Sequence, residues 1–389
     1  MIAGAGRRDC FEGGASKNEA PPSVEQPSRT TCRDGFAQGL CLGSVFRMKP
    51  LTAIDLFAGA GGLSVGLKRA GFLVVAAVEL DTHAAASFSM NHRETVVLNQ
   101  DIRSLPAEEL LRAANLGNRR LDLLTGCPPC QGFSSLRTRR QATSVPDKRN
   151  DLLLEFLRLV KALRPRAIIL ENVPGLLADH TFKIFCRELT RMNYGYSAQV
   201  LDAGDFGVPQ RRRRLVLAAV EAVPFDAEWF APGRARQATV RDAIGALASA
   251  GSSGDLLHDY PEKRSREVLA RIRAIPRDGG SRSDVRSMKQ LDCHQRSDGF
   301  SDVYGRMAWA KLAPTITSGC TNPSKGRFIH PEKHRAITLR EAALLQTFPK
   351  GYRFDLTRGK EHVAAQIGNA FPPKLIVPLA KRIARTLRQ

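Results

Sequence analysis

The sequence predicts an α/β fold with a doubly wound, mostly parallel sheet and a second, smaller domain. Between residues 51 and 220, apolar segments of strand length alternate with segments of helical periodicity. The strand segments are almost continuously apolar, which is typical of parallel strands that helices cover on both faces. Beyond residue 221 the alternation fades into sequence rich in Arg, Gly, Ser and Asp. We therefore expect a separate domain to begin there.

The expected elements follow from local pattern in chain order. The expected strands are short apolar runs at 51–57, 72–80, 121–126, 166–172, 197–201 and 214–220. The expected helices have apolar residues at helical spacing or begin at a capping residue such as Asp81, and they cover 63–71, 81–92, 151–163, 180–193, 338–348 and 374–389. Strands that alternate with helices in this way place ligands beyond the strand carboxyl ends.

Composition divides the chain into four segments. Residues 1–47 are rich in Gly, Ser, Pro and charges, and we expect a disordered extension there. The larger α/β domain, which we expect to hold the ligand sites at its strand ends, covers 48–220, and the smaller domain is expected over 221–313. Regular structure returns in 314–389, and we expect this C-terminal segment to pack back onto the first domain.

The chain is strongly basic, with 59 Lys and Arg residues, 38 Asp and Glu residues and a net charge of +21. The simplest partner for this surplus is a polyanion, although charge alone leaves ribosomal or membrane-surface association open. No stretch approaches the roughly 18 uninterrupted apolar residues of a membrane helix, and residues 1–47 lack the apolar core of a secretory signal. A cytoplasmic protein without membrane contact is therefore expected.

A glycine-rich turn follows the first strand in the stretch "DLFAGAGGLS". Gly59 and Gly61 permit a tight turn and a close approach of the backbone to a ligand. A dinucleotide fingerprint requires a third glycine where Ser64 stands, and no phosphate-binding lysine follows the turn. Glu79, at the end of the second strand, could accept hydrogen bonds from ribose hydroxyls, and Asp101 could accept one from an adenine amino group. This pattern favours a nucleoside-bearing cofactor.

A second cluster, "GCPPCQGFS" at 126–134, follows the strand at 121–126. Three interpretations are open: half of a zinc site, a redox dithiol, or a nucleophilic thiolate. No second CxxC or pair of histidines at ligand spacing accompanies Cys127 and Cys130, so a metal site is not expected. Glu171 follows the strand at 166–172 at the same sheet edge. A thiolate and a carboxyl group beside a nucleoside pocket suit nucleophilic attack on an electron-poor ring with general-acid assistance.

These blocks together resemble the DNA (cytosine-5) methyltransferases. "DLFAGAGG", "PPCQGFS", "ENVPGLL", "QRRRRL" and "QIGNAFPP" occur in the order of that family, from about residue 51 to the C-terminus except for 221–313. The resemblance implies the S-adenosylmethionine-dependent methyltransferase fold, with a target-recognition domain at 221–313. It also implies methylation of C5 of a cytosine that is flipped out of a short specific sequence in double-stranded DNA.

The resemblance also implies roles for individual residues. Cys130 is the expected nucleophile that adds to C6 of the cytosine, and Cys127 lies outside the core motif. Glu171 is expected to protonate N3, Arg214 to hold O2 and Arg212 to support the catalytic loop. The residues implied to contact the S-adenosylmethionine cofactor are Phe57, Gly59, Gly61, Glu79, Asp101, Ile102, Pro129, Leu152 and Asn369. The "RND" at 149–151 departs from the Arg-Gly pair that is commoner in the family.

A bacterial modification enzyme is therefore the leading hypothesis, with a monomer expected. The basic loop 137–149 is expected to contact DNA phosphates. A cognate restriction endonuclease is considered as a partner without stable contact. One alternative is a tRNA cytosine-5 methyltransferase, which would share the catalytic blocks but is disfavoured by the sizeable variable region. The other is a non-catalytic DNA-binding regulator, which the intact Cys130, Glu171 and Arg214 disfavour.

Overall fold

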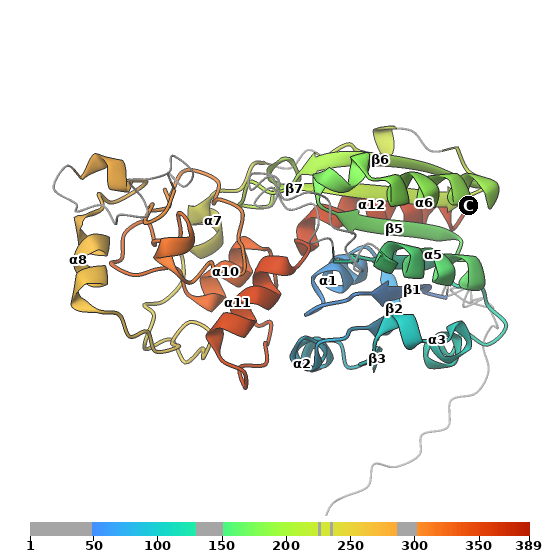
Figure 1. Ribbon diagram of the computed structural model, residues 1–389, viewed down its shortest axis with the longest axis horizontal. Coiled ribbons are helices and arrows are strands. Elements are labelled where there is room, and N and C mark those ends of the chain that lie inside the picture. Colours follow the sequence, from blue (N-terminus) through green and yellow to red (C-terminus); the bar gives the residue numbers. More distant parts are fainter. Residues whose placement is uncertain (1–48, 130–150, 225–226, 234–235, 286–301) are drawn as a thin grey trace, which may run out of the picture. The chain divides into compact units, whose positions relative to one another are not determined.

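The computed structural model describes residues 49–129, 151–224, 227–233, 236–285 and 302–389 (Figure 1). Cys130 and the basic loop 137–149 lie outside these ranges. The prediction of a disordered extension over 1–47 also falls outside them, so the description below concerns the part of the chain that begins at Lys49.

The centre of the fold is a seven-stranded sheet with the order β3-β2-β1-β4-β5-β7-β6. Its strands are β1 (Leu51–Leu56), β2 (Phe72–Val78), β3 (Val96–Leu98), β4 (Leu123–Gly126), β5 (Ala167–Asn172), β6 (Tyr194–Asp202) and β7 (Arg213–Glu221). The five strands from β3 to β5 pair in parallel, whereas β7 runs antiparallel to both β5 and β6. This arrangement confirms the predicted doubly wound, mostly parallel sheet.

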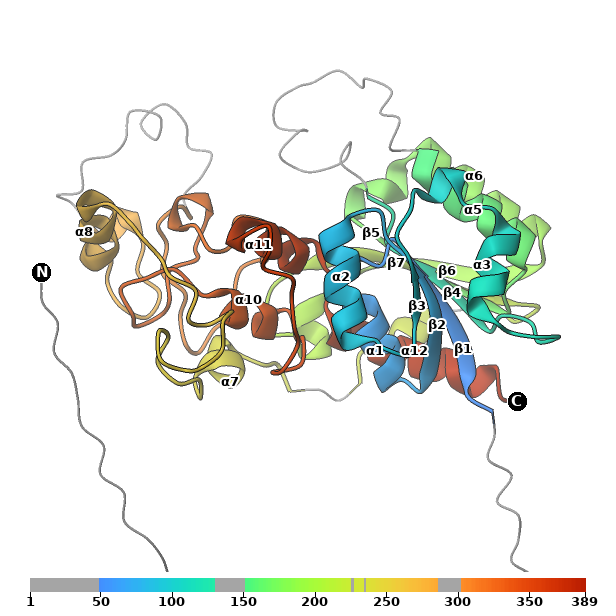
Figure 2. The ribbon, with the colours of Figure 1, turned by 90° about the horizontal axis from the view of Figure 1, so that it is seen from below.

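Helices cover both faces of the sheet (Figure 2). One face carries α3 (Ala107–Ala114), α5 (Asp151–Leu163) and α6 (His180–Arg191), and the other carries α1 (Gly62–Arg69) and α12 (Pro373–Thr386). Within β1, Ile54 and Leu56 face the first set of helices, and Ala53 faces the second. Burial on both faces explains why the strands are almost continuously apolar.

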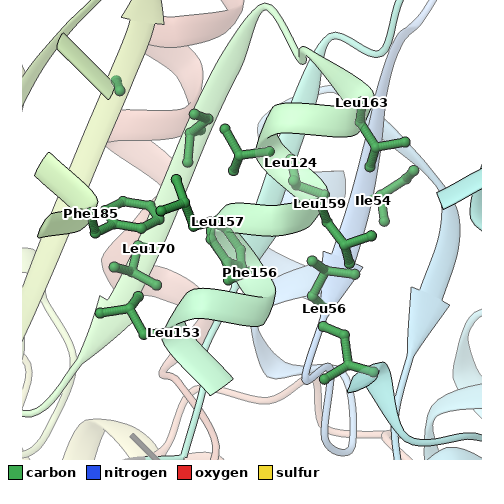
Figure 3. Close-up of a cluster of buried hydrophobic side chains, with 14 of the residues drawn as sticks. Ile54, Leu56, Leu124, Leu153, Phe156, Leu157, Leu159, Leu163, Leu170 and Phe185 are labelled. Atoms are coloured by element: carbon green, nitrogen blue, oxygen red, sulfur yellow. The ribbon is translucent and has the colours of Figure 1, made fainter. Parts of the chain in front are cut away.

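The helix α5 shows how the apolar pattern produces the core (Figure 3). Leu153, Phe156, Leu157 and Leu163 recur at the spacing of one helical face and pack on the strand residues Ile54, Leu56, Leu124 and Leu170. The Phe156 ring lies 5.8 Å from the ring of Phe185 on α6, measured between centroids. Asp151 in the first turn favours the start of the helix because its negative charge is attracted to the positive end of the helix dipole.

After Glu221, the last residue of β7, the described residues of the region 221–313 add no further strand to the sheet. The region contains α7 (Val240–Ile244) and α8 (Arg266–Ala274), joined by irregular segments. Val240, Ile244 and Leu257 share an apolar core with α10 (Leu339–Leu345) and α11 (Lys360–Asn369). The division of the chain into a recognition domain and a C-terminal segment therefore stays a prediction.

Helix α2 (Thr82–Asn91) begins where the sequence predicted, because the Asp81 carboxylate accepts a hydrogen bond from the Ala84 backbone N–H at 2.8 Å. Helix α11 was not predicted from the sequence. Its stretch "KEHVAAQIGN" has few apolar residues, and its stability comes from packing against α10 and α2 rather than from its own pattern.

Helices α1 and α12 approach each other closely at Gly66. A Cβ atom at this position would lie 2.3 Å from Cγ2 of Ile376 and 2.6 Å from the carbonyl oxygen of Pro373. Only a residue without a side chain fits there, and the contact holds the C-terminal helix against the sheet.

We expect Gly66→Ala to lower the free energy of unfolding by about 1–3 kcal/mol through overpacking. This loss should outweigh the higher helix propensity of alanine compared with glycine. The measurement is urea unfolding followed by circular dichroism. Gly351→Ala is the control, since nothing lies within 4 Å of the Cβ position at Gly351. A Gly66→Ala chain as stable as wild type would contradict this account of the α1–α12 contact.

Candidate active site

A cavity of about 850 Å³ lies beyond the carboxyl ends of the parallel strands. The loops that follow β1, β2, β4 and β5 form one wall, with residues 57–60, 79–84, 127–129 and 171–173. The end of α11 forms the opposite wall with residues 368–371. The cavity is thus built from segments that lie far apart in the sequence.

The structure brings nearly all of the predicted site residues together around this cavity. The predicted cofactor residues that line it are Phe57, Gly59, Glu79, Asp101, Ile102, Pro129, Leu152 and Asn369. Glu171 and Arg214 line it as well, whereas Gly61 and Arg212 do not. Cys130, the predicted nucleophile, directly follows the cavity residue Pro129 but lies outside the described residues.

Gly61 meets a different constraint from the one predicted. Its φ is 93°, and a Cβ atom there would lie 2.6 Å from the Tyr352 hydroxyl and 2.7 Å from His92 Nε2. The Tyr352 hydroxyl donates a hydrogen bond to the carbonyl oxygen of Ala60 at 2.5 Å, and His92 Nε2 lies 2.9 Å from the same hydroxyl. Gly61 therefore allows buried polar groups to support the loop from behind.

Glu79 ties the glycine-rich loop to the end of β2. One of its carboxylate oxygens accepts a hydrogen bond from Gly59 N–H and the other from Asp81 N–H, each at 2.7 Å. Burial raises the pKa of Glu79, and these backbone bonds partly oppose the shift. Each oxygen keeps a further lone pair for a ligand hydroxyl.

The other end of the cavity holds an ion pair. Arg214 Nε, near the start of β7, lies 2.9 Å from an oxygen of Glu171 on β5. The half-buried Cys127 thiol donates a hydrogen bond to Glu171. Burial, followed by the negative charge of Glu171, raises the pKa of Cys127 well above its usual value. Cys127 is therefore a neutral thiol and a poor nucleophile.

Arg212 binds the C-terminal wall rather than lining the cavity. Its guanidinium is buried, and burial lowers its pKa to about 9. It donates to the carbonyl oxygens of Ile316 and Gly368 at 2.9 Å and of Ala370 at 3.0 Å. Two of these carbonyls flank Asn369, so Arg212 holds the backbone on both sides of a predicted cofactor residue.

Several cavity residues were missed by sequence reasoning. His362 on α11 lies 3.1 Å from the Asp81 carboxylate, and Arg358 lies 4.0 Å from it. His83 Nδ1 lies 2.7 Å from the Asp355 carboxylate. These pairs join α2 to the segment before and within α11. Local pattern carries no signal for them, since the partners are more than 260 positions apart in the chain.

Asp55 was also missed, although a carboxylate inside the apolar strand "LTAIDLF" is an unusual feature that could have marked it. It is fully buried in β1 under the glycine-rich loop, and it accepts a hydrogen bond from the Ser64 hydroxyl at 2.6 Å. Burial raises its pKa from the ordinary value of 3.8 to about 7. Asp55 does not line the cavity.

We expect the contribution of Asp55 to the stability of the protein to fall as pH rises from about 4 to about 7, because the unfolded chain then releases a proton that folded Asp55 retains. The contribution is at most roughly 4 kcal/mol and levels off above the folded pKa. Asp55→Asn should flatten this dependence. Urea unfolding at several pH values tests it, and parallel stability curves for variant and wild type would show that Asp55 does not titrate in this range.

No helix among the described residues is long and apolar enough to cross a membrane.

Residues 51–385 match the model of the C-5 cytosine-specific DNA methylase family. The chain is 38% identical over 346 residues to the type II methylase M.HgiDII of Herpetosiphon aurantiacus, with 86% of this chain and 95% of the relative covered. It is 33% identical over 342 residues to the type II methyltransferase M1.HphI of Haemophilus parahaemolyticus, with 86% and 87% covered.

Solved structures give the same result for the fold. The chain resembles an E. coli prophage protein described as a DNA modification methyltransferase, with a TM-score of 0.64, 28% identity and 87% of this chain and 100% of that chain covered. It also resembles the S. pombe Dnmt2 methyltransferase, with a TM-score of 0.56, 19% identity and coverages of 87% and 99%. The second likeness concerns the fold alone. The chain belongs to the C-5 cytosine-specific DNA methylase family.

Proposed function

We propose that this enzyme transfers a methyl group from S-adenosylmethionine to C5 of a cytosine flipped out of a short specific sequence in double-stranded DNA. The observation that carries this proposal is that the two ends of one cavity differ in their chemistry. Near Glu79 and Asp101 it suits a nucleoside, and near Glu171 and Arg214 it offers an acid and a cation to a base.

The residues at the Glu79 end of the cavity fit S-adenosylmethionine. Gly59 lines the cavity with a φ of 55°, and nothing lies within 4 Å of its Cβ position, so a ligand can approach its backbone closely. The free lone pairs of Glu79 suit ribose hydroxyls, and Asp101 suits the adenine amino group while it also pairs with Arg103 at 2.6 Å. Bound there, the cofactor would supply an electrophilic methyl group.

The other end of the cavity, with Glu171 and Arg214, suits a cytosine ring. C5 of cytosine is a weak nucleophile, so the ring must first be activated. In the proposed mechanism Glu171 carries a proton, taken from water, when the base is bound. The Cys130 thiolate forms a bond to C6 while Glu171 gives this proton to N3, which makes C5 enamine-like. Arg214 would hold O2 of the same ring through N–H groups not used for Glu171. After methylation, a water molecule takes the C5 proton, the electrons of the C5–H bond re-form the C5–C6 double bond, and the C6–sulfur bond breaks to release the Cys130 thiolate. N3 returns its proton to Glu171.

The target atoms are inaccessible inside a duplex, so the base must leave the stack to reach this cavity. The basic loop 137–149 would contact phosphates, and basic residues of 221–313 would read bases in the major groove. Similarity to two type II enzymes along most of the chain supports a role in restriction and modification. We further propose that the enzyme acts as a monomer, without stable contact with a restriction endonuclease. We place this activity in the cytoplasm.

Methyl transfer from labelled S-adenosylmethionine tests the proposal. Wild type should label duplex DNA and leave tRNA unlabelled. Bisulfite sequencing of the treated DNA should find 5-methylcytosine within one recognition sequence. Cys130→Ser should abolish transfer with cofactor affinity nearly unchanged, because the thiol acts on the base. Cys127→Ser should keep most activity, since its thiol is neutral.

Three results would count against the proposal. Labelling of tRNA alone would favour the tRNA enzyme, and cofactor-independent DNA binding without any transfer would favour the regulator. A Cys127→Ser chain as inactive as Cys130→Ser would revive a dithiol or metal role for the cysteine pair.

Glu79→Ala and Asn369→Ala are expected to weaken S-adenosylmethionine binding by about tenfold or more, because each removes hydrogen-bonding groups from the cofactor wall. DNA affinity without cofactor should stay within about twofold of wild type, since neither residue lies on the base side. Calorimetry gives the first constant and fluorescence anisotropy the second. An equal loss of both affinities would indicate misfolding instead.

A further inference from the structure

We infer that Gln346 is a positioning residue of the cofactor site, although it does not line the cavity. Its amide binds the end of α11 and thereby sets the backbone that carries Asn369. This inference rests on the proposed function, because it assigns Gln346 a role in the binding of S-adenosylmethionine through Asn369.

Gln346 is fully buried at the C-terminal cap of α10. Its Nε2 donates to the carbonyl oxygen of Ile367 at 2.6 Å and lies 3.4 Å from that of Ala370. Its Oε1 accepts a hydrogen bond from Nε2 of Gln210 at 2.7 Å. Gln210 in turn donates to the carbonyl oxygen of Leu345 at 3.1 Å and accepts from Ile316 N–H at 3.0 Å. The amide of Gln346 thus connects three segments of the chain.

These bonds meet a general need of helix ends. The last carbonyl groups of a helix have no partner within it, and a buried carbonyl must find a donor elsewhere. At the end of α11, the Gln346 amide donates to the carbonyl oxygen of Ile367, and the Arg212 guanidinium donates to those of Gly368 and Ala370. Side chains from α10 and from the residue before β7 therefore determine how α11 ends.

A third contact restricts the same turn. A Cβ atom on Gly368 would lie 2.2 Å from the carbonyl carbon of Thr317 and 2.4 Å from the backbone nitrogen of Ser318. The backbone of residues 317–318 therefore lies directly against Gly368. The turn that carries Asn369 is enclosed by Gln346, Arg212 and residues 317–318.

Asn369 itself depends on this enclosure. Its side chain is exposed to the cavity and makes no hydrogen bond to any group in the described ranges of the chain. Its direction is therefore set by its backbone alone. Loss of the donor at Gln346 would leave the Ile367 carbonyl unpaired and let the turn shift, whereas Glu171 and Arg214 are anchored in the sheet. Cofactor binding should suffer, and chemistry at saturating cofactor should not.

The test uses two variants of the full chain. Gln346→Met keeps the approximate volume and removes the donor, and Gln346→Ser gives a second chance of a folded protein. We expect the dissociation constant and the KM for S-adenosylmethionine to rise about tenfold, as for one misaligned ligand contact, with kcat on duplex DNA within about twofold of wild type.

The matched control is His258→Leu. His258 is buried at the opposite end of α10, where it bonds Thr338 Oγ1 at 2.8 Å and the carbonyl oxygen of Ala248 at 2.9 Å. This variant should lower the melting temperature as much as Gln346→Met and leave the KM for cofactor unchanged. A folded Gln346 variant with wild-type cofactor affinity, or an equal rise in KM for His258→Leu, would overturn the inference. A wild-type chain that binds no S-adenosylmethionine would instead overturn the proposed function.

Discussion

The buried guanidinium of Arg212 is the interaction on which the cavity depends, because it joins the residue before β7 to the end of α11. Its three carbonyl acceptors compensate for the loss of water around the charge, and the lowered pKa of about 9 shows how strongly burial acts. A planar group with several fixed donors can bridge separate backbones in this way, which lysine cannot do. Without this bridge, the carbonyl groups of Gly368 and Ala370 would lose the donor that Arg212 supplies, and Gln346 and residues 317–318 would have to hold the turn that carries Asn369.

The charged side chains around the cavity give its two ends different chemistry. At one end, Glu79 uses the inner face of its carboxylate to hold the glycine-rich loop and keeps lone pairs for a ligand. At the other end, Glu171 lies between Arg214 and the neutral thiol of Cys127. The sheet fixes their separation, because Glu171 lies in β5 and Glu79 directly follows β2 of the same sheet. A small-molecule donor and a base can therefore face each other without rearrangement of the core.

Much of this could be predicted from the sequence, because it depends on local pattern. The apolar runs indicated the strands, and the rule that parallel strands end at one edge placed Glu79 and Glu171 at one site. The direction of β7 could not be predicted, since an apolar run carries no sign of whether its pairing is parallel. The support of Ala60 by Tyr352 joins positions 292 apart, and the Gln210–Gln346 bond joins positions 136 apart. Local pattern predicts neither contact, and Gly61 was assigned to the ligand for this reason.

The central claim is that Cys130 attacks a cytosine held between Glu171 and Arg214, and covalent trapping tests it most directly. Duplex DNA in which 5-fluorocytosine replaces cytosine throughout removes the need to know the recognition sequence. Fluorine cannot leave as the C5 proton does, so the C6–sulfur bond should persist. With S-adenosylmethionine present, we predict a denaturation-resistant complex whose cross-linked peptide carries the DNA on Cys130. No complex, or a cross-link on Cys127, would contradict the account.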